Sequence, residues 1–335
     1  MSAWVYLVRR ISILPIILLG LFTIVFFLSH VIPADPARAM AGEGAEDKHV
    51  EKIRAEFNLD KPLLIQYFLF LRNILRGNLG VSIHTWRPVI EDLKDYFPAT
   101  FELTIVAMIL AVAIGIVLGV LCAVCRGTLL DSLTTVFSVA GLAMPHFWLG
   151  IILQILLCLL FYALPLGGRI DPNIPFREIT GLYILDSIIT GNWTALRSCL
   201  THIILPAFTL AITSLGLFAR ITRATLLETL REDYIRTARA IGHSERGVVW
   251  RALRNVLIPI VTVMAMQFSF LLGGTVVVET VYDWPGLGLY ATQSALTFDY
   301  PAIIGLTLLF GIVRMGFNLL TDLSYFALDP RIRQG

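Results

Sequence analysis

Lysine is scarce in this sequence. Among 335 residues only Lys48, Lys52, Lys61 and Lys94 occur, all in one early stretch. A phosphate-binding loop of the form GxxxxGK[ST] needs a lysine, so it is excluded from every later part of the chain. The Gly-x-Ser-x-Gly turn that presents a nucleophilic serine is absent as well. The sequence therefore predicts that this chain is not an ATPase on its own and is not an enzyme.

Charged residues are few in general. They make up 15% of the chain, whereas soluble globular proteins carry roughly a quarter. The formal net charge of +2 gives no reason to expect a nucleic-acid partner. Apolar residues make up 57% and fall into six blocks, which are Ile11–Leu28, Phe101–Val124, Leu133–Leu164, Ile203–Phe218, Val256–Val278 and Pro301–Phe326.

Each block approaches or exceeds the roughly 20 residues that cross a hydrocarbon core of about 30 Å. A helix satisfies its own backbone polar groups in hydrocarbon, so helices are the expected form. The sequence thus predicts an all-α, polytopic membrane protein with six transmembrane helices. The first block could be a secretory signal, because Arg9 and Arg10 precede it. Its apolar run exceeds the usual core of roughly 7–15 residues, which favours a retained anchor.

Cysteine and histidine do not form an obvious site. Cys122 and Cys125 make a CxxC pattern at the end of an apolar block. Redox or metal chemistry is one interpretation of this pair, and two small helix-packing residues are the favoured one. The six histidines are scattered and no HExxH occurs, so we predict no metal site.

Arginine is unevenly distributed along the chain. Eight arginines and no lysine lie within residues 219–255, which share one side of the membrane with both termini if there are six spans. The loop Glu279–Tyr300, on the other side, contains acidic residues and neither Lys nor Arg. Because basic residues stay on the inner side, we predict that both termini and residues 219–255 are cytoplasmic.

Residues 219–255 have a helix-turn-helix pattern. Gly242 with His243 and Ser244 makes a break, and a second helix starts around Val248. One interpretation is a solvated basic loop that only sets the topology. A purely solvated loop would not keep apolar residues such as Ile235 and Ile241. We therefore favour a short amphipathic helix that is offered to a cytoplasmic partner.

The stretch "EDYIRTARAIG", followed by "ALRNVLIP", resembles the coupling segment of permeases from binding-protein-dependent ABC importers. Further motifs are similar to the dipeptide/oligopeptide (peptide/nickel) branch of that family. They are "NLDKPLLIQY", "GNLGVS", "FPATFEL", "MPHFWLG", "LPLGGRID", "YDWPGLG", "FDYPAI" and "DPRIR". The sequence departs from the broad signature where Arg236-Thr237-Ala238 replaces Glu-Ala-Ala and Asn255 replaces a proline.

The resemblance implies a type I ABC importer transmembrane domain whose short cytoplasmic helix docks in a groove of an ATPase subunit. The docking residues would be Glu232, Asp233, Tyr234, Arg236, Thr237, Ala238, Ala240 and Gly242. The implied partners are a second homologous permease, two ABC ATPase subunits and an extracytoplasmic substrate-binding protein, within membrane lipid. ATP and Mg would be held by the ATPase subunits, and this chain would bind no cofactor.

The expected organisation is an N-terminal transmembrane anchor at 1–33, an external segment at 34–98 and a permease core at 99–328. The core contains the coupling segment 219–255, and a cytoplasmic tail follows at 329–335. The resemblance places the chain in a bacterial cytoplasmic (inner) membrane, where it would carry di- and oligopeptides. A nickel chelate is an alternative solute. A secondary transporter is an alternative class, although it would usually show more intramembrane carboxylates.

Three places are candidates for the pathway or a gate. Trp284-Pro285-Gly286 is either a tight loop with a membrane-interface Trp or a gate beneath the binding protein. The pair Met144-Pro145 predicts a kink in the third span. The kink lines the pathway in one interpretation and is only a structural feature in the other. Arg314 lies about halfway along the sixth span, where a guanidinium costs at least about 2.5 kcal/mol. Arg314 either lines the pathway or holds the two permeases together. Asp322 lies nearer the cytoplasmic end of the span, and we interpret it as structural.

Overall fold

The computed structural model describes residues 3–31, 37–38, 44, 46–56 and 59–328. Within these residues the regular secondary structure is helical, and the one β-type contact is an isolated bridge between Val81 and Pro88. The all-α prediction is therefore confirmed, while the predicted tail at 329–335 lies outside the described residues. The chain forms two compact units. One comprises Phe101–Trp284 with the stretch from Phe317, and the other comprises Ala3–Thr100 with Pro285–Gly316.

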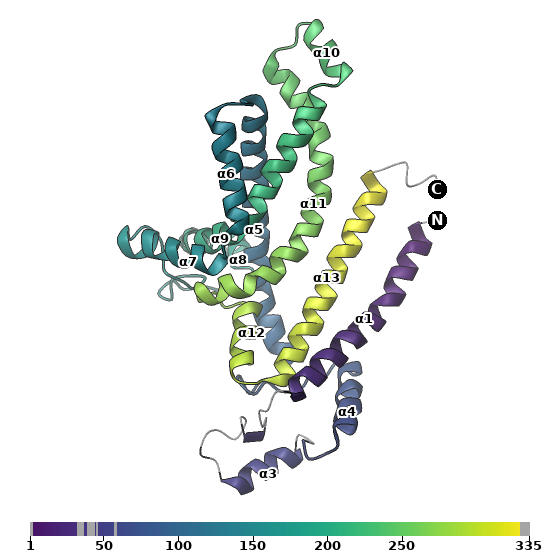
Figure 1. The fold of residues 1–335 in the computed structure, drawn as a ribbon. Helices are drawn as coiled ribbons and strands as arrows, with labels where there is room; N and C mark the ends of the chain where they lie inside the picture. The colour runs from purple at the N-terminus through teal and green to yellow at the C-terminus, as the bar shows by residue number, and fades with distance from the viewer. Residues whose placement is uncertain (1–2, 32–36, 39–43, 45, 57–58, 329–335) are drawn as a thin grey trace. The chain divides into compact units, whose positions relative to one another are not determined.

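Figure 1 labels the helices along the chain. They are α1 (Ala3–Val31), α3 (Asp47–Glu56), α4 (Leu63–Leu75), α5 (Val89–Val124), α6 (Leu129–Ala143), α7 (His146–Leu153), the π-helix η1 (Gln154–Leu160), α8 (Tyr183–Ile189), α9 (Trp193–Thr229), α10 (Asp233–Ala240), α11 (Glu245–Val281), α12 (Leu287–Leu296) and α13 (Tyr300–Leu328).

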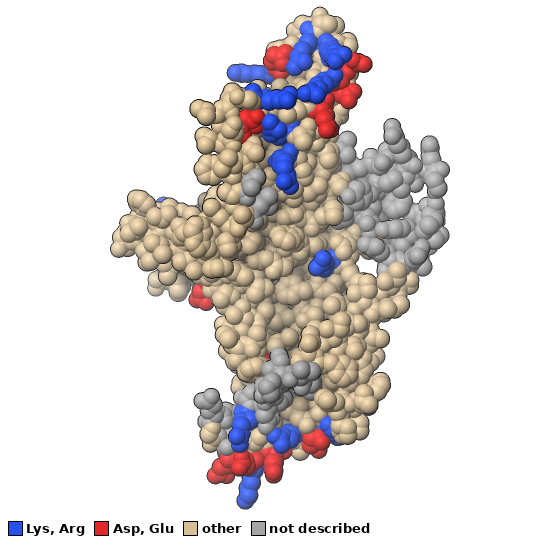
Figure 2. All heavy atoms as spheres, viewed as in Figure 1, with Lys and Arg blue, Asp and Glu red and all other residues tan. Residues whose placement is uncertain are grey.

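Five helices in the described part of the chain are long and apolar enough to cross a membrane, and they lie in α1, α5, α9, α11 and α13. They correspond to five of the six predicted spans. The remaining span, predicted over 133–164, is divided between α6 and the continuous α7–η1 pair. Over α6 and α7 the surface seen in Figure 2 carries few charged side chains, as expected for segments of a membrane protein.

The third predicted span is broken where a kink was expected. α6 ends at Ala143, and the backbone is extended at Met144 (ψ 127°) and at Pro145 (ψ 134°) before α7 begins. The cause is local, because proline has no N–H to donate and its ring disfavours the helical conformation of the residue before it. The predicted interruption at Pro145 is therefore confirmed, and it divides the span into two helices where a kink was expected.

In the first unit, small residues let helix backbones approach closely. A Cβ atom added to Gly119 of α5 would lie 2.6 Å from the carbonyl oxygen of Ala219 and 2.5 Å from Cβ of Thr222, both on α9. A Cβ added to Gly216 of α9 would lie 2.7 Å from the carbonyl oxygen of Ser138 on α6. Close approach at small residues is a common way for transmembrane helices to pack, because it maximises van der Waals contact.

A bidentate ion pair joins the start of α6 to α9. Nε and Nη2 of Arg223 donate to the two carboxylate oxygens of Asp131 at 2.7 and 2.9 Å. The backbone N–H of Gly127 also donates to this carboxylate, at 3.1 Å. These hydrogen bonds lower the pKa of Asp131, and those from Arg223 have the largest effect. Cys122, in the last turn of α5, and Cys125, just after it, are free thiols, and no disulfide involves either of them.

The loop that precedes α8 is organised around a buried carboxylate. Asp186 accepts hydrogen bonds from the backbone N–H groups of Ile179, Thr180 and Gly181 and from the hydroxyl of Thr180. Burial alone would raise the pKa of Asp186, but these hydrogen bonds outweigh it and lower the pKa. A lowered pKa in the folded state means that Asp186 contributes stability above the ordinary pKa of Asp. That contribution is lost as the pH falls through the lowered value.

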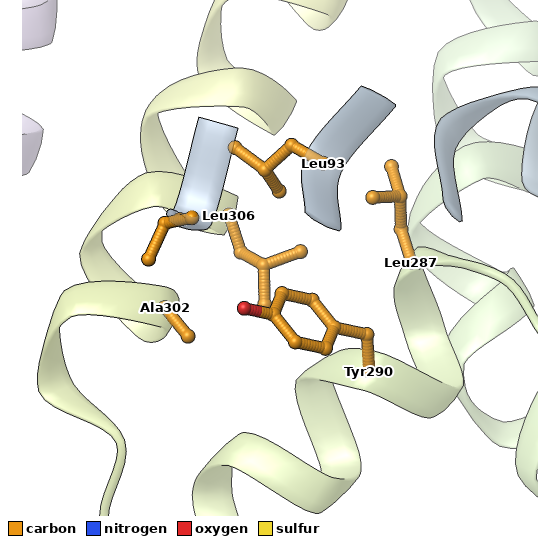
Figure 3. Close-up of a cluster of buried hydrophobic side chains, with 6 residues drawn as sticks. Leu93, Leu287, Tyr290, Ala302 and Leu306 are labelled. Atoms are coloured by element: carbon orange, nitrogen blue, oxygen red, sulfur yellow. The ribbon is translucent and has the colours of Figure 1, made fainter. Parts of the chain in front are cut away.

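The second unit has two neighbouring apolar clusters. In one, Phe22 and Phe26 of α1 pack with Ile304 and Leu308 of α13. In the other, shown in Figure 3, side chains from α5, α12 and α13 converge, and they are Val89, Leu93, Leu287, Tyr290, Ala302 and Leu306. The hydroxyl of Tyr290 in this second cluster donates to the buried carboxylate of Asp92 at 3.1 Å. Leu79 is packed against both clusters, so one contiguous core joins α1, the start of α5, α12 and α13.

We predict that Gly119→Ala destabilises the chain, because its Cβ would require the α5 and α9 backbones to separate. Overpacking of this kind costs about 1–3 kcal/mol. The matched control is Gly273→Ala in α11, where a Cβ would meet no atom within 4 Å. Thermal unfolding of the detergent-solubilised chain, followed by tryptophan fluorescence, should show a lower midpoint for Gly119→Ala alone. Equal midpoints for the two variants would contradict the close α5–α9 approach.

Candidate functional site

The predicted coupling segment contains a separate short helix, α10, between α9 and α11. Figure 1 shows it beyond the ends of those two helices, within the same unit. Ile235 and Ala238, three residues apart, are buried, and α10 packs against α11. Residues three apart lie on one face of a helix, so α10 has a single buried face and leaves the others open. The predicted helix-turn-helix pattern is confirmed.

The end of α10 is defined by glycine. Gly242 has a φ of +87°, a conformation that L side chains rarely adopt. Its N–H donates to the carbonyl of Arg239 at 3.0 Å, and the N–H of His243 donates to that of Ala238 at 3.1 Å. This pair of bonds is a Schellman motif, which satisfies carbonyls that a helix end would otherwise leave unpaired. The break that the sequence predicts at Gly242 thus has a defined geometry.

Side chains then fix α10 to the first turns of α11. The hydroxyl of Ser244 accepts from the N–H of Gly247 and caps α11. Nε of Arg239 donates to Glu245 at 2.9 Å across the break. The amide of Asn255 donates to the hydroxyl of Tyr234 at 2.8 Å. The helix, its turn and the start of α11 are therefore held in one conformation.

The structure exposes most of the predicted docking residues. Those with exposed side chains or surfaces are Glu232, Asp233, Tyr234, Arg236, Thr237, Ala240 and Gly242. Ala238 is buried, so its small side chain serves the packing of α10 and offers no surface to a partner. Ile241 is 68% exposed although it is apolar. Figure 2 shows basic side chains gathered around α10, with acidic ones beside them.

Trp284 is the first residue of the Trp-Pro-Gly motif, and its side chain is only 1% exposed. The membrane-interface tryptophan, one of the two interpretations of this motif, is therefore excluded. The guanidinium carbon of Arg169 lies 5.6 Å from the centroid of the Trp284 ring and 3.6 Å from that of Tyr183. An arginine between two aromatic rings gains cation–π attraction, which favours burial of all three side chains.

The same arginine forms a buried ion pair. Nη2 of Arg169 donates to Glu102 at 2.6 Å and to the carbonyl of Gly181 at 2.9 Å. The other carboxylate oxygen of Glu102 accepts from the N–H of Ile184 at 2.7 Å, at the start of α8. A pair of this kind is costly to break, because removing one partner leaves an uncompensated buried charge. Sequence analysis missed it, although an acidic residue at the edge of an apolar block is itself a signal that a partner is needed.

The other two residues of the motif belong to the start of α12. Pro285 precedes Gly286, which is the N-cap of this helix with an extended backbone. The N–H of Leu287 donates to the hydroxyl of Thr100 at 2.7 Å. The motif therefore marks the change of direction before α12. Whether it acts as a gate stays a prediction.

Two pathway candidates on helices have different surroundings. At the break between α6 and α7, Met144 is half-buried, Pro145 is exposed, and Nδ1 of His146 lies 3.3 Å from the carbonyl oxygen of Thr209. Arg314 is exposed, and no described residue forms an ion pair with it. The helix continues past Asp322, but the side chain of that residue lies outside what the structure describes.

No group of three or more His, Cys, Asp and Glu side chains among the described residues could hold a metal ion. The arrangement around α10 contains arginine, tyrosine and small residues, which suit a protein contact. Both carboxylate oxygens of the buried Glu102 accept hydrogen bonds from protein groups, so they are not available to a metal ion. The candidate site is therefore a contact surface at α10, together with the candidate pathway residues of the spans.

Comparison with known proteins assigns the chain to a family. A family model described as the binding-protein-dependent transport system inner membrane component matches residues 115–334. A model for the N-terminal part of a binding-protein-dependent transport system membrane component matches residues 3–104. Together the two models match most of both compact units.

Several curated proteins are similar over their full length. The probable D,D-dipeptide transport system permease protein DdpB of Escherichia coli is 43% identical, over 100% of this chain and 99% of the relative. The dipeptide transport system permease protein DppB of Alkalihalophilus pseudofirmus is 36% identical, over 98% and 99%. The glutathione transport system permease protein GsiC of Pectobacterium atrosepticum is 39% identical, over 98% of each. The chain therefore belongs to the family of inner-membrane components of binding-protein-dependent transport systems, the permease subunits of ABC importers.

Proposed function

We propose that this chain and a second homologous permease enclose a pathway for di- and oligopeptides across a bacterial cytoplasmic membrane. Two ABC ATPase subunits supply the energy, and an extracytoplasmic substrate-binding protein delivers the peptide. The observation that carries the proposal is full-length similarity to permeases whose names specify dipeptides, D,D-dipeptides and glutathione. All three solutes are small peptides, which favours a peptide over the alternative of a nickel chelate. Membership of the importer family removes the secondary-transporter alternative.

In this proposal both termini and α10 face the cytoplasm. The support is the distribution of charge, because eight arginines lie within residues 219–255 and no Lys or Arg lies within Glu279–Tyr300. ATP and Mg²⁺ belong to the ATPase subunits, and this chain binds no cofactor. A chain without lysine after Lys94 has no P-loop in its cytoplasmic part, which supports a non-catalytic role.

The role of α10 in this proposal is to receive movement from an ATPase subunit. A helix that docks in a groove needs exposed side chains on one side and a fixed position on the other. α10 has both, since Tyr234 and Ile241 are exposed while Ile235 is buried. The turn at Gly242 connects α10 to α11. This helix begins at Glu245 and continues without interruption through a candidate membrane span. Movement of α10 would therefore move the cytoplasmic end of a helix that also crosses the membrane.

The proposal is tested by reconstituting the chain with its second permease and ATPases in proteoliposomes, with ATP inside and the binding protein outside. A radiolabelled dipeptide should accumulate only when ATP and all partners are present. A nickel–histidine chelate serves as the matched solute and should not accumulate. The chain purified free of its partners should hydrolyse no ATP.

Two outcomes of this experiment would contradict the proposal in different ways. Uptake driven by an ion gradient without ATP, or saturable ATP hydrolysis by the isolated chain, would remove the assignment as a non-catalytic importer subunit. Accumulation of the nickel chelate in place of the dipeptide would change the solute and leave the importer class in place.

Gly242 allows a sharper test of docking at α10. A Cβ at this position meets no atom of the chain within 4 Å and Gly242 is exposed, so a side chain added here begins in open space where a docked partner would lie. Gly242→Trp should reduce the amount of ATPase subunit that co-purifies by about tenfold, equivalent to about 1.4 kcal/mol. Gly242→Ala is the matched control, since it carries the same strain at positive φ without the bulk. Normal assembly and uptake with Gly242→Trp would show that α10 does not dock.

Arg314 is tested by changing its charge and its shape separately. A fixed positive charge in the pathway would favour a passing peptide carboxylate, so Arg314→Gln should reduce uptake and Arg314→Lys should restore part of it. Uptake by the reconstituted importer and the yield of intact complex are measured for both variants. If the complex dissociates in both, Arg314 holds the permease interface. If uptake is unchanged in both, Arg314 has neither role.

A further inference from the structure

The loop between α4 and α5 presents a tryptophan on an unfavourable backbone. Trp86 has a φ of +57° and its side chain is 61% exposed. Four described residues other than glycine have a positive φ, and they are Trp86, Tyr162, Asp283 and Phe298. A bulky residue in this conformation is uncommon, and backbone strain of this kind concentrates at functional sites. The exposed indole has no packing role that would explain the strain.

Hydrogen bonds on both sides of Trp86 hold the loop in place. The N–H of Trp86 donates to the carbonyl of Ser82 at 3.1 Å, and the N–H of Ser82 donates to that of Arg87 at 2.9 Å. The hydroxyl of Ser82 (2.5 Å) and the N–H of His84 (3.1 Å) both donate to the buried carboxylate of Asp299. The loop is therefore fixed before any partner arrives. A tryptophan on a fixed backbone has only two side-chain torsions left to order, so it binds with little loss of conformational entropy.

Asp299 connects this loop to the turn between α12 and α13. The second oxygen of its carboxylate accepts from the N–H of Ala302 at 3.1 Å, in the first turn of α13. Leu296, at the end of α12, and Phe298, in the turn that follows it, are two further exposed apolar residues. The carboxylate of Asp299 thus joins two loops of one unit. Both loops carry exposed apolar side chains.

The surroundings of the loop are charged, which favours water over the membrane interface. Ile83 packs with Val50 of α3, a helix with the charged sequence "DKHVEKIRAE". Nη2 of Arg87 pairs with Asp95 at 2.8 Å and with Glu91 at 3.8 Å in the first turns of α5. A tryptophan among so many charges does not have the surroundings of an interfacial aromatic belt.

The length of α5 supports the same conclusion. Its residues 89–100 precede the apolar block that begins at Phe101, and at about 1.5 Å per residue they span about 18 Å. Even a tilt of about 40° would leave about 14 Å along the membrane normal. The headgroup region on each side is only about 5–8 Å thick. The start of α5 at Val89, to which the Trp86 loop is attached, therefore lies beyond the headgroup region.

We propose that Trp86 is an anchor for the extracytoplasmic substrate-binding protein and inserts its indole into an apolar pocket on that partner. This inference rests on the proposed function, which places the loop outside the cytoplasm. A protein partner fits because tryptophan is enriched among the residues that dominate protein interfaces. The surrounding charges of Arg87, Glu91 and Asp95 would form the polar rim of the contact. A second permease fits less well, because it packs along the membrane spans and the loop lies beyond them.

The test measures how tightly the purified binding protein of this importer binds the assembled importer in nanodiscs. Trp86→Ala removes the indole and keeps the backbone strain, whereas Trp86→Gly removes both. Both variants should raise the Kd by about 30-fold, equivalent to about 2 kcal/mol. Trp86→Gly should also unfold at a higher temperature than Trp86→Ala, because glycine adopts a positive φ without strain. A merely structural Trp86 would instead let Trp86→Gly bind normally.

The matched control is Trp193→Ala, since Trp193 is 70% exposed at the start of α9 and lies in the other unit. Its Kd should change less than about threefold. Normal binding by both Trp86 variants, or an equal loss in Trp193→Ala, would overturn the anchor. Quenching of Trp86 fluorescence by brominated phosphatidylglycerol would overturn it in favour of the membrane. Loss of the second permease from both Trp86 variants would overturn it in favour of a subunit contact. Failure of the wild-type importer to bind the binding protein would instead refute the proposed function.

Discussion

Hydrocarbon offers no hydrogen-bond partner to a backbone N–H or carbonyl, and this constraint decides where the chain can leave the helical conformation. Helices continue well past the apolar blocks of the sequence, as α5 does from Val89 and α9 does to Thr229. A helix that ended inside apolar surroundings would leave its last carbonyls unpaired. The break between α6 and α7 falls at Pro145, which has no N–H to satisfy. The N–H of Met144 still donates to the carbonyl of Ala140, so the break leaves this N–H paired as well.

The same surroundings require each buried charge to have a partner. Asp131 pairs with Arg223 and Glu102 pairs with Arg169, and each of these carboxylates also accepts a backbone N–H. The extra hydrogen bond matters, because Coulomb attraction alone does not offset the cost of removing two charges from water. Arg314 differs from this pattern, being exposed without an ion-pair partner among the described residues. A cation in that situation needs water or another subunit, and for this reason it is a candidate for the pathway or the permease interface.

The fold was predictable because apolar blocks of about 20 residues leave little choice of structure. The break near Gly242 was also predictable, since glycine ends helices through a local conformation. Contacts between residues far apart in the sequence were not predictable. Spacing alone cannot show that Arg169 lies against Glu102 and Trp284, because that requires the packed helices. The strained backbone at Trp86 gives no sequence signal either, as tryptophan is not a residue that favours a positive φ.

A short helix can transmit a displacement only if it stays folded under load. The eight residues of α10 are too few to form a stable helix alone in water. The stability of α10 must therefore come from α11. The exposed Arg239–Glu245 pair contributes little, since such pairs are worth about 0–1 kcal/mol. Burial of Ile235 contributes about 1.5–3 kcal/mol, which is the larger of the two contributions. A loop whose only task was to set the topology would need arginines, but it would need neither this buried contact nor a defined Schellman turn. The buried contact of Ile235 and the Schellman turn together are what a mechanical connection from α10 to α11 requires. From its start at Glu245, α11 is one continuous helix about 55 Å long.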